Sequence, residues 1–441
     1  MSNFRYVLKL IWVFLVKFRI ILLLGILAGF GFFFMASRLG PAFLGKSNEM
    51  IGVVGRFGLD SLPANILGLV SEGLTRVEPD GTLKPGLASS WETNDKGKTW
   101  IFHLDQNKSW QDGKKIVSPD LHFSFSDVTV EKPDVKTIVF KVQSPFAPFP
   151  TVVSKPLFKK GLLGNGAYKV NKITVSTGNV EKIVMTDKDK NRKTFYFYPT
   201  EDRAKLALKL GQISSLFEIF NPEPFNRWQT VKVLATTDFG KYSAVFFNTQ
   251  KGQLTANKSL RQALAYAINK EVFGQTRALG PISPDSWAYN PQVKPYSYAP
   301  LKAKELIESL SKEEKEKLTL KLSTVPLLVN VAEKIARDWG AVGVKTSVQA
   351  SSGVPEVFDA FLAIFDIPKD PDQYALWHSN QNITNITNYA NPRIDKLLED
   401  GRTQIEQTAR QKIYLDFQRF LLEDAPVVFL YHPTLYTVFR N

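Results

Sequence analysis

The sequence predicts an α/β fold that follows a single membrane-spanning helix. Two patterns lead to this prediction. Residues 20–37 form an apolar run without a charged side chain, which is the length of a transmembrane helix. Beyond residue 250, segments that alternate apolar and polar residues are interleaved with apolar residues at helical spacing, as in βαβ units. The 441 residues are enough for two or three domains with their own cores.

The N-terminal run lies between Arg19 and Arg38. As a helix it would be roughly 27 Å long, close to the thickness of the hydrocarbon layer. More basic residues precede the run than follow it, so the positive-inside bias places residues 1–19 in the cytoplasm and the bulk of the chain outside, with 38–50 as a tether. A cleaved signal peptide is the alternative. The long basic segment and the lack of a clean A-x-A site favour an uncleaved signal anchor at 20–37.

Composition excludes several classes of function. The chain has no cysteine, which rules out disulfides, thiol catalysis and cysteine-based zinc sites. The net charge is +14, but the basic residues are scattered rather than clustered with aromatic residues, so we expect no nucleic-acid partner. The sequence contains no G-x-S-x-G or H-E-x-x-H motif. The histidines lack metal-ligand spacing, and we expect no metal or cofactor; they are His103, His122, His378 and His432.

The elements up to residue 300 follow from local composition. β-Branched and aromatic residues predict strands at 98–104, 137–142, 167–173, 195–198, 214–219 and 242–247. A helix is predicted at 201–210, with an apolar stripe of Ala204, Leu206, Ala207 and Leu210. A second helix is predicted at 260–273, and the Pro- and Gly-rich residues 280–300 are expected to cross the surface without regular structure.

The remaining elements predict a compact α/β unit. Strands at 318–324 and 344–348 flank a helix at 329–339. The apolar run 359–365 is typical of a strand at the centre of a sheet. Helices at 392–400 and 408–422 then precede a strand at 427–431.

Short motifs along residues 51–441 occur in a specific order. They are Leu87-Ala88-Ser89-Ser90-Trp91-Glu92, Trp110-Gln111-Asp112-Gly113, Gly164-Asn165-Gly166-Ala167-Tyr168, Phe247-Asn248-Thr249, Asp370-Pro371-Asp372, Asn391-Pro392-Arg393-Ile394-Asp395 and Glu423-Asp424-Ala425-Pro426. This ordered set resembles the family 5 solute-binding proteins, the extracytoplasmic receptors of oligopeptide, dipeptide and nickel ABC importers. With an anchor in place of a lipoprotein signal, the chain looks like a membrane-anchored variant.

The resemblance implies a two-lobed fold like that of periplasmic binding proteins (type II, peptide-binding class). Lobe 1 would comprise 51–248, with 426–441 returning to it, and lobe 2 would comprise 249–425. The two crossing strands would form a hinge near Asn248 and Thr249 and near Asp424 and Pro426, and the lobes would close on a ligand. The segment 118–134 is shorter than the helical insertion usual in the family, which we expect to widen the mouth of the cleft or to alter the preferred ligand length.

The resemblance also suggests binding residues. Asp366 aligns with an aspartate that pairs with the ligand's α-ammonium in peptide-binding relatives. Loops at Asp60 and Ser61 and at Phe220 and Asn221 are expected to border the cleft. Trp287 and Trp377 are candidates for stacking on the ligand, although a place in the core is the favoured interpretation for both. Asp370 and Asp372 are expected to fix a turn, in preference to contacting ligand or a cation.

The implied function is the substrate-binding component of an ABC importer that takes up oligopeptides. Its partners would be a peptide, the permease subunits and, through the N-terminal helix, the membrane. The cell membrane, crossed once, would be its location. One alternative is a ligand sensor or scaffold of the same fold without transport. A cell-wall-active enzyme is a further, less favoured alternative.

Overall fold

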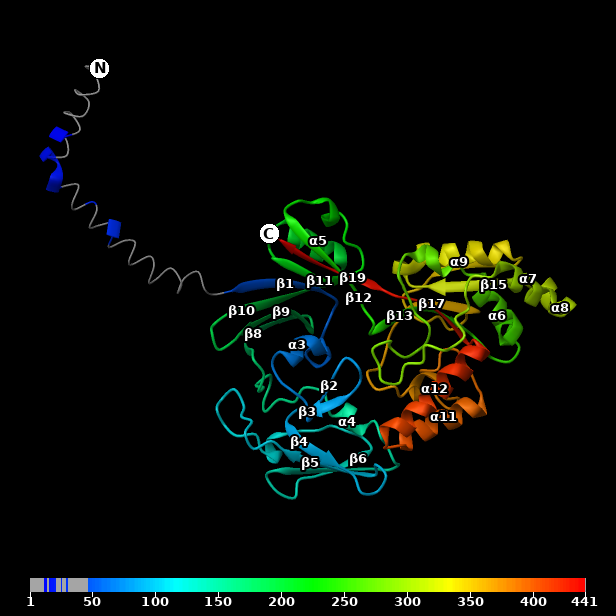
Figure 1. The fold of residues 1–441 in the computed structure, drawn as a ribbon, viewed down its shortest axis with the longest axis horizontal. Helices are drawn as coiled ribbons and strands as arrows, with labels where there is room; N and C mark the ends of the chain where they lie inside the picture. The colour runs from blue at the N-terminus through cyan, green and yellow to red at the C-terminus, as the bar shows by residue number, and fades with distance from the viewer. Residues whose placement is uncertain (1–11, 14–15, 21–24, 26–28, 31–46, 441) are drawn as a thin grey trace, which may run out of the picture.

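The computed structural model describes residues 12–13, 16–20, 25, 29–30 and 47–440. Most of the predicted anchor, 20–37, and most of the tether lie outside these residues. Among the described residues no helix is both long and apolar enough to cross a membrane. Residues 47–440 form two α/β lobes, which lie side by side in Figure 1.

The first lobe is built on a seven-stranded sheet in the order β12-β19-β11-β1-β10-β9-β8. β1 pairs in parallel with both β10 and β11, whereas the other pairs are antiparallel. Helix α5 (Glu201–Lys209) packs on this sheet through its small residues Ala204 and Ala207. The strands are β1 (Asn48–Val54), β8 (Lys169–Ser176), β9 (Asn179–Thr186), β10 (Arg192–Tyr198), β11 (Ser215–Ile219), β12 (Val231–Thr237) and β19 (Thr434–Arg440).

A smaller antiparallel sheet, β4-β5-β7-β6, forms the other half of the first lobe. In β5 buried and half-buried residues alternate, as expected for a sheet with one face on a core. That core is aromatic, with Phe102, Phe140 and Phe149 in mutual contact. The elements here are α3 (Ala64–Gly68), the hairpin β2 (Thr75–Val77) and β3 (Leu83–Pro85), β4 (Ala88–Glu92), β5 (Thr99–Leu104), β6 (Val128–Glu131), β7 (Thr137–Val142) and α4 (Phe149–Val152).

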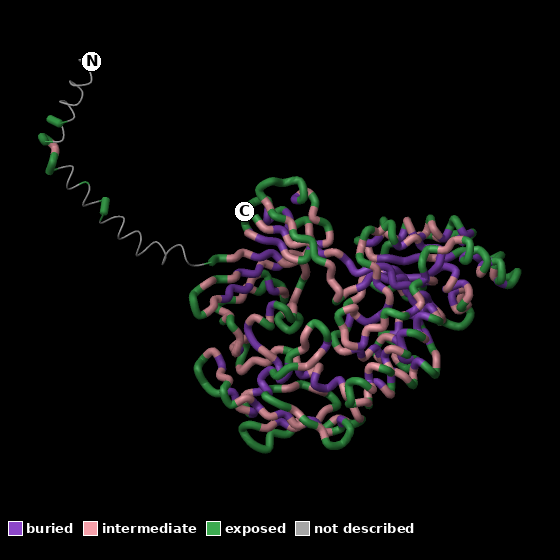
Figure 2. Tube along the Cα trace, in the orientation of Figure 1, coloured by how far each residue is buried: buried purple, intermediate pink, exposed green. Residues whose placement is uncertain are grey.

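The second lobe has a six-stranded sheet in the order β14-β18-β13-β17-β15-β16. Both of its faces are covered, because successive side chains of β13 point into different cores: Val245 and Phe247 pack with α6, α7 and α9, and Tyr242, Ala244 and Phe246 pack with α10, α11 and α12. The predicted place of 359–365 inside a sheet is confirmed by β17, and Figure 2 shows buried residues concentrated along these strands.

The elements of the second lobe are β13 (Lys241–Phe247), α6 (Lys258–Ala267), β14 (Thr276–Arg277), α7 (Pro300–Glu308), α8 (Lys312–Glu316), β15 (Thr319–Thr324), α9 (Val329–Ala341), β16 (Lys345–Ala350), β17 (Ala360–Asp366), α10 (Tyr374–Trp377), α11 (Pro392–Thr403), α12 (Gln407–Asp424) and β18 (Val427–His432). Residues 280–300 contain no helix or strand until α7 begins, as predicted.

The chain passes between the two large sheets at residues 238–240, which join β12 to β13, and at Pro433, which joins β18 to β19. The two connections touch, since the Asp238 N–H donates to the Pro433 carbonyl at 2.9 Å. Figure 1 shows β19 returning from the second lobe to the first. The expected boundaries at 248 and 426 therefore require correction, because β13 and β18 belong to the sheet of the second lobe. The turn signals at Asn248 and Pro426 mark strand ends inside that lobe.

Two helices differ from the prediction. In α5 the predicted stripe is only half right: Leu206 and Leu210 are exposed, whereas Lys205 and Leu208 are buried beside Ala204 and Ala207. The predicted helix 260–273 ends at Ala267, after which Ile268 is extended and a 3-10 turn, Lys270–Phe273, follows. The strands that were not predicted are β1, β2, β3, β4, β6, β9, β12, β14 and β19.

The early end of α6 is stabilised by a buried lysine. The Lys270 ammonium donates to the carbonyls of Ala265 at 2.6 Å, Ile268 at 3.2 Å and Tyr296 at 2.7 Å. Burial, assisted by the nearby Arg277, lowers the pKa of Lys270 to about 6. The ammonium therefore hydrogen-bonds to three carbonyls. Burial nevertheless makes the charged form of Lys270 unfavourable, because the ammonium group is removed from water.

This lysine predicts a dependence of stability on pH. Its pKa is lower in the folded than in the unfolded chain, so between pH 6 and pH 9 the unfolded chain binds more protons, and the free energy of unfolding should rise with pH. One such group gives a slope of at most about 1.4 kcal/mol per pH unit. Urea unfolding from pH 6 to 9 measures it. In Lys270→Met the slope should become shallower, and an unchanged slope would contradict the assignment.

Candidate ligand-binding site

Asp366 lies at the last position of β17, directly opposite Lys241 on β13. The Asp366 Oδ1 and Lys241 Nζ atoms are 2.7 Å apart, and Lys241 is also 3.4 Å from Asp238 Oδ2. Burial of Lys241 opposes its charge, but Asp366 and Asp238 outweigh this effect and raise the pKa of Lys241. The Asp366 side chain is itself 83% exposed. It is therefore open to a cation from solvent, in competition with Lys241.

The position of Asp366 is tied to the connection between the lobes. The N–H of the next residue, Ile367, donates to the Gly240 carbonyl at 2.7 Å, within the segment that joins β12 to β13. An exposed carboxylate at the junction of two lobes can bind an ammonium group by charge-assisted hydrogen bonds. A ligand held there would lie beside the segment that must bend if the lobes move.

The two predicted loops of the first lobe lie at one edge of its large sheet. Asp60 and Ser61 are exposed after β1, and Phe220 and Asn221 follow β11, which is parallel to β1 and next to it. Local bonds hold both loops: the Gly58 N–H donates to Ser61 Oγ at 2.9 Å, and the Phe220 N–H donates to Glu201 at 2.6 Å. In the described part of the chain, none of these four residues forms a hydrogen bond or ion pair with the second lobe.

The two candidate tryptophans have different environments. Trp377 is 1% exposed and its ring is stacked on Phe246, with centroids 6.3 Å apart, so it belongs to the core of the second lobe. Trp287 is half-buried, and its backbone N–H donates to the Asp80 carbonyl of the first lobe at 3.0 Å. The Trp287 ring lines a cavity between the lobes, so of the two only Trp287 is placed to contact a ligand.

Asp370 and Asp372 fix a turn, as expected. The Asp372 N–H donates to Asp370 at 2.9 Å, and the Tyr374 N–H donates to Asp372 at 3.1 Å. Each carboxylate also binds an arginine: Asp370 takes two bonds from Arg410, at 2.6 and 2.9 Å, and Asp372 takes one from Arg402 at 2.9 Å. Burial raises the pKa of Asp372 despite Arg402. No group of three or more acidic or histidine residues in the described chain is arranged to hold a metal ion.

Two cavities separate the four-stranded sheet from the second lobe. A direct bond also joins the two lobes here, since the Ala147 N–H of the first lobe donates to the Arg402 carbonyl of the second at 2.6 Å. One cavity, of about 500 Å³, is lined by Trp91, Trp100, Trp287 and Arg410. The other, of about 580 Å³, lies against α10 and α11, and we call it the distal cavity. It is lined in part by Phe125, Asp127 and Val128, from the shortened segment 118–134, so this segment does border a space between the lobes.

The four predicted hinge residues lie at the end of β13 that is remote from the connections between the lobes. Thr249 N–H donates to the Thr387 carbonyl at 2.7 Å, Asn248 accepts a bond from Asn388 at 3.1 Å, and the Pro426 carbonyl accepts from the Phe247 N–H at 2.9 Å. They hold the second lobe together and do not span the two lobes.

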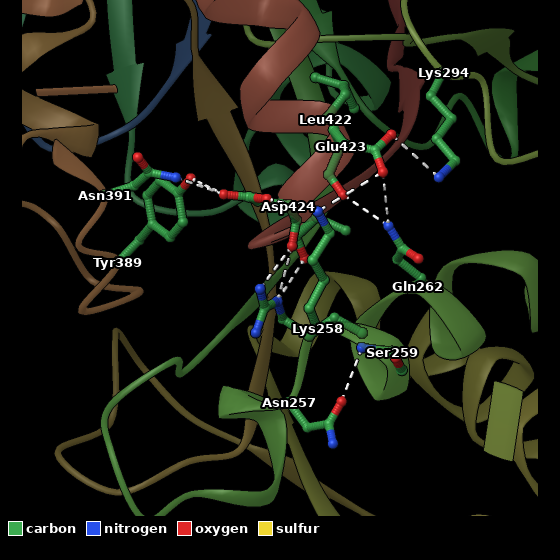
Figure 3. Close-up of polar contacts among 12 residues, drawn as sticks. Asn257, Lys258, Ser259, Gln262, Lys294, Tyr389, Asn391, Leu422, Glu423 and Asp424 are labelled. Atoms are coloured by element: carbon green, nitrogen blue, oxygen red, sulfur yellow. Dashed lines mark hydrogen bonds and ion pairs between the residues drawn. The ribbon is translucent and has the colours of Figure 1, made fainter. Parts of the chain in front are cut away.

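Asp424, the fourth of these residues, is the centre of a polar cluster (Figure 3). Its carboxylate accepts bonds from Tyr389 at 2.6 Å, Asn391 at 2.7 Å and Lys258 at 2.9 Å. Burial works against ionisation, but these bonds outweigh it and lower the pKa of Asp424. The cluster joins the start of α6 and the end of α12 to the loop before α11, so two of the sequence motifs, those at 391–395 and 423–426, meet here.

Sequence reasoning missed Lys241 and both cavities. Nothing in the sequence around Lys241, apart from its place at the start of a strand, indicates that its side chain pairs with Asp366. Phe125 and Phe146 could have been noticed as aromatic residues in a segment without predicted structure, but nothing in their spacing indicates that the second lobe lies against them.

Comparison with known proteins agrees with this architecture. The family model for bacterial extracellular solute-binding proteins, family 5 Middle, matches residues 82–385. A dipeptide-binding protein of Escherichia coli is 23% identical over 443 residues, covering 81% of this chain and 82% of that protein.

Solved structures show the same fold. NikZ from Campylobacter jejuni, in complex with Ni(L-His), has a TM-score of 0.73 at 24% identity, covering 89% of this chain and 94% of that one. An oligopeptide-binding protein from Bacillus subtilis, in complex with a nonapeptide, has a TM-score of 0.68 at 20% identity, covering 90% and 95%. With the family model spanning most of both lobes, the chain belongs to the family 5 bacterial extracellular solute-binding proteins.

Proposed function

We propose that this protein is the extracytoplasmic substrate-binding component of an ABC importer and that it binds peptides between its lobes. Family membership supports the class of function, and relatives that match more than four-fifths of the chain are named for binding dipeptides and oligopeptides. The single observation in this structure that carries the proposal is Asp366, an exposed carboxylate at the junction of the lobes.

Binding is proposed to begin with exchange of cations at Asp366. The α-ammonium of a peptide replaces Lys241, which keeps its second partner, Asp238, at 3.4 Å. The peptide then lies between the loops at Asp60 and Asn221 on one side and the second lobe on the other. The connections at 238–240 and Pro433 are proposed as the hinge, in place of the residues predicted from the sequence, because these connections join the two large sheets. The permease would recognise the closed form, and the protein would release the peptide unchanged.

The N-terminal run at 20–37 is proposed to anchor the protein to the cell membrane, with the lobes outside. Its length and the flanking basic residues support this role. Carbonate washing of membranes from cells that express the full chain tests it: an integral anchor keeps the protein in the pellet, whereas release of a shortened protein from the cells would show cleavage.

The function is tested by the ligand that the protein carries. The full chain is purified in mild detergent, and released small molecules are identified by mass spectrometry. Peptides are expected, together with a rise in the melting temperature when the same peptides are added back. Ni(L-His) serves as the comparison ligand. Failure to recover any peptide, with no thermal shift across a peptide library, would overturn the proposal, as would chemical conversion of a bound peptide.

A further inference from the structure

We propose that the distal cavity is a second subsite for the peptide and that it takes a lysine or arginine side chain. This inference rests on the proposed function, because the same peptide would occupy both places. Its volume of about 580 Å³ lies within the usual range of small-ligand pockets.

The walls of the distal cavity come from both lobes. Phe125, Val128 and Phe149 belong to the first lobe, whereas Tyr374 and Arg402 belong to the second. Phe149 is buried beneath Phe125, with ring centroids 6.1 Å apart, and the half-buried Phe125 is therefore supported from behind. An aliphatic stem that fills this space would contact both lobes and so favour the closed arrangement.

The positive charge in the wall is already compensated. Arg402 Nε donates to Asp372 at 2.9 Å, and the guanidinium carbon is 3.9 Å from the ring centroid of Tyr374 and 5.2 Å from that of Phe146. Arg402 is thus an aromatic-stacked member of an ion pair, and it does not make the cavity attractive to an anion.

Two carboxylates that line the distal cavity lack such compensation. Asp127 is exposed and has no ion pair in the described chain. Glu399, on α11, has His378 Nε2 at 3.4 Å, a partner that is charged only when protonated. One carboxylate comes from each lobe, and both line the distal cavity. A cation in the cavity would be attracted by both carboxylates. The aromatic rings nearby also favour a cation.

The segment that supplies Asp127 is held at its base. Ser118 Oγ donates to the Asp134 carbonyl at 2.5 Å, and Lys132 Nζ donates to the Leu121 carbonyl at 2.6 Å. Asp127 directly precedes β6, which pairs with β7, so binding at the site does not require the ordering of a free loop, which would reduce the affinity for a side chain.

Calorimetry on the full chain with two series of peptides tests the subsite. Alanine pentapeptides carry lysine at one position in the first series, and norleucine, which is similar in length but uncharged, at the same position in the second. At one position or more, lysine is expected to bind at least about tenfold more tightly than norleucine. The preference should fall to less than about twofold in the Asp127→Asn/Glu399→Gln variant.

A matched variant, Asp189→Asn/Glu316→Gln, removes two exposed carboxylates elsewhere and should keep the lysine preference, which separates the subsite from a general effect of charge. Phe125→Ala should weaken both series to a similar extent, because it removes apolar contact only. Equal binding of lysine and norleucine peptides at every position would overturn the subsite and leave the proposed function intact. Absence of any peptide binding would overturn both.

Discussion

Arg261→Met is expected to lower the free energy of unfolding by about 4 kcal/mol, the largest change we anticipate for a single substitution. Arg261 is 5% exposed and donates to four backbone carbonyls: those of Thr255 and Ala256, at 2.9 and 2.8 Å, and those of Asp424 and Ala425, at 2.6 and 3.1 Å. Methionine fills much of the same volume but leaves these buried acceptors without donors, at a cost of about 1–3 kcal/mol for each one that water cannot reach.

Urea unfolding followed by circular dichroism measures the change. Arg227→Met is the control, because the Arg227 side chain is 77% exposed and its only ion pair among the described residues is with Glu223 on the surface. This substitution should change stability by less than about 1 kcal/mol. Equal effects of the two substitutions would show that the bonds to the carbonyls do not stabilise the second lobe.

Asp366→Asn is expected to weaken binding of peptides with a free N-terminus by about 10- to 100-fold. This is the loss in affinity expected when a charged hydrogen-bond partner of the peptide ammonium is replaced by a neutral one. N-acetylated peptides, which lack the ammonium group, should bind the wild type about as weakly as the variant binds the free peptides. Calorimetry with both kinds of peptide measures the effect. If the variant kept its affinity for free peptides, Asp366 would not be the ammonium partner.

Lys241→Gln serves as the opposite control, because Lys241 and a peptide ammonium compete for one carboxylate. Its removal should raise the affinity for free peptides and leave that for acetylated peptides nearly unchanged. A loss of affinity for both would mean that Lys241 supports the site and does not compete for it.

Much of the fold could be predicted because local pattern and tertiary role agree. The run at 359–365 is apolar on both faces, and β17 is in fact covered by helices on both faces of its sheet. Asp370 and Asp372 flank a proline, and their carboxylates do cap the turn. In each case the physical cause lies within a few residues, where sequence can reveal it.

The differences arise where distant segments decide the outcome. Asn248 and Pro426 end strands, and a strand end looks the same whether the chain then enters another lobe or turns back within its own. Lys205 of α5 is buried although it is charged, because it faces Glu201 at 3.4 Å and the sheet below. Asp127 and Glu399 line the distal cavity from different lobes, an arrangement that no spacing in the sequence encodes.

The contacts from Ala147 to Arg402 and from Asp80 to Trp287 have a kinetic consequence. These two bonds connect the second lobe to the small sheet and to the β2–β3 hairpin of the first lobe. The covalent connections join the two large sheets, so the lobes are linked on both sides of the space between them. A peptide ammonium can reach the exposed Asp366 directly, but separation of the lobes on this side requires the two bonds to break. Where that separation limits full insertion of the peptide, the observed association rate should level off at high peptide concentration. The same two bonds should also lower the dissociation rate of a bound peptide, which lengthens the time available for its transfer to the permease.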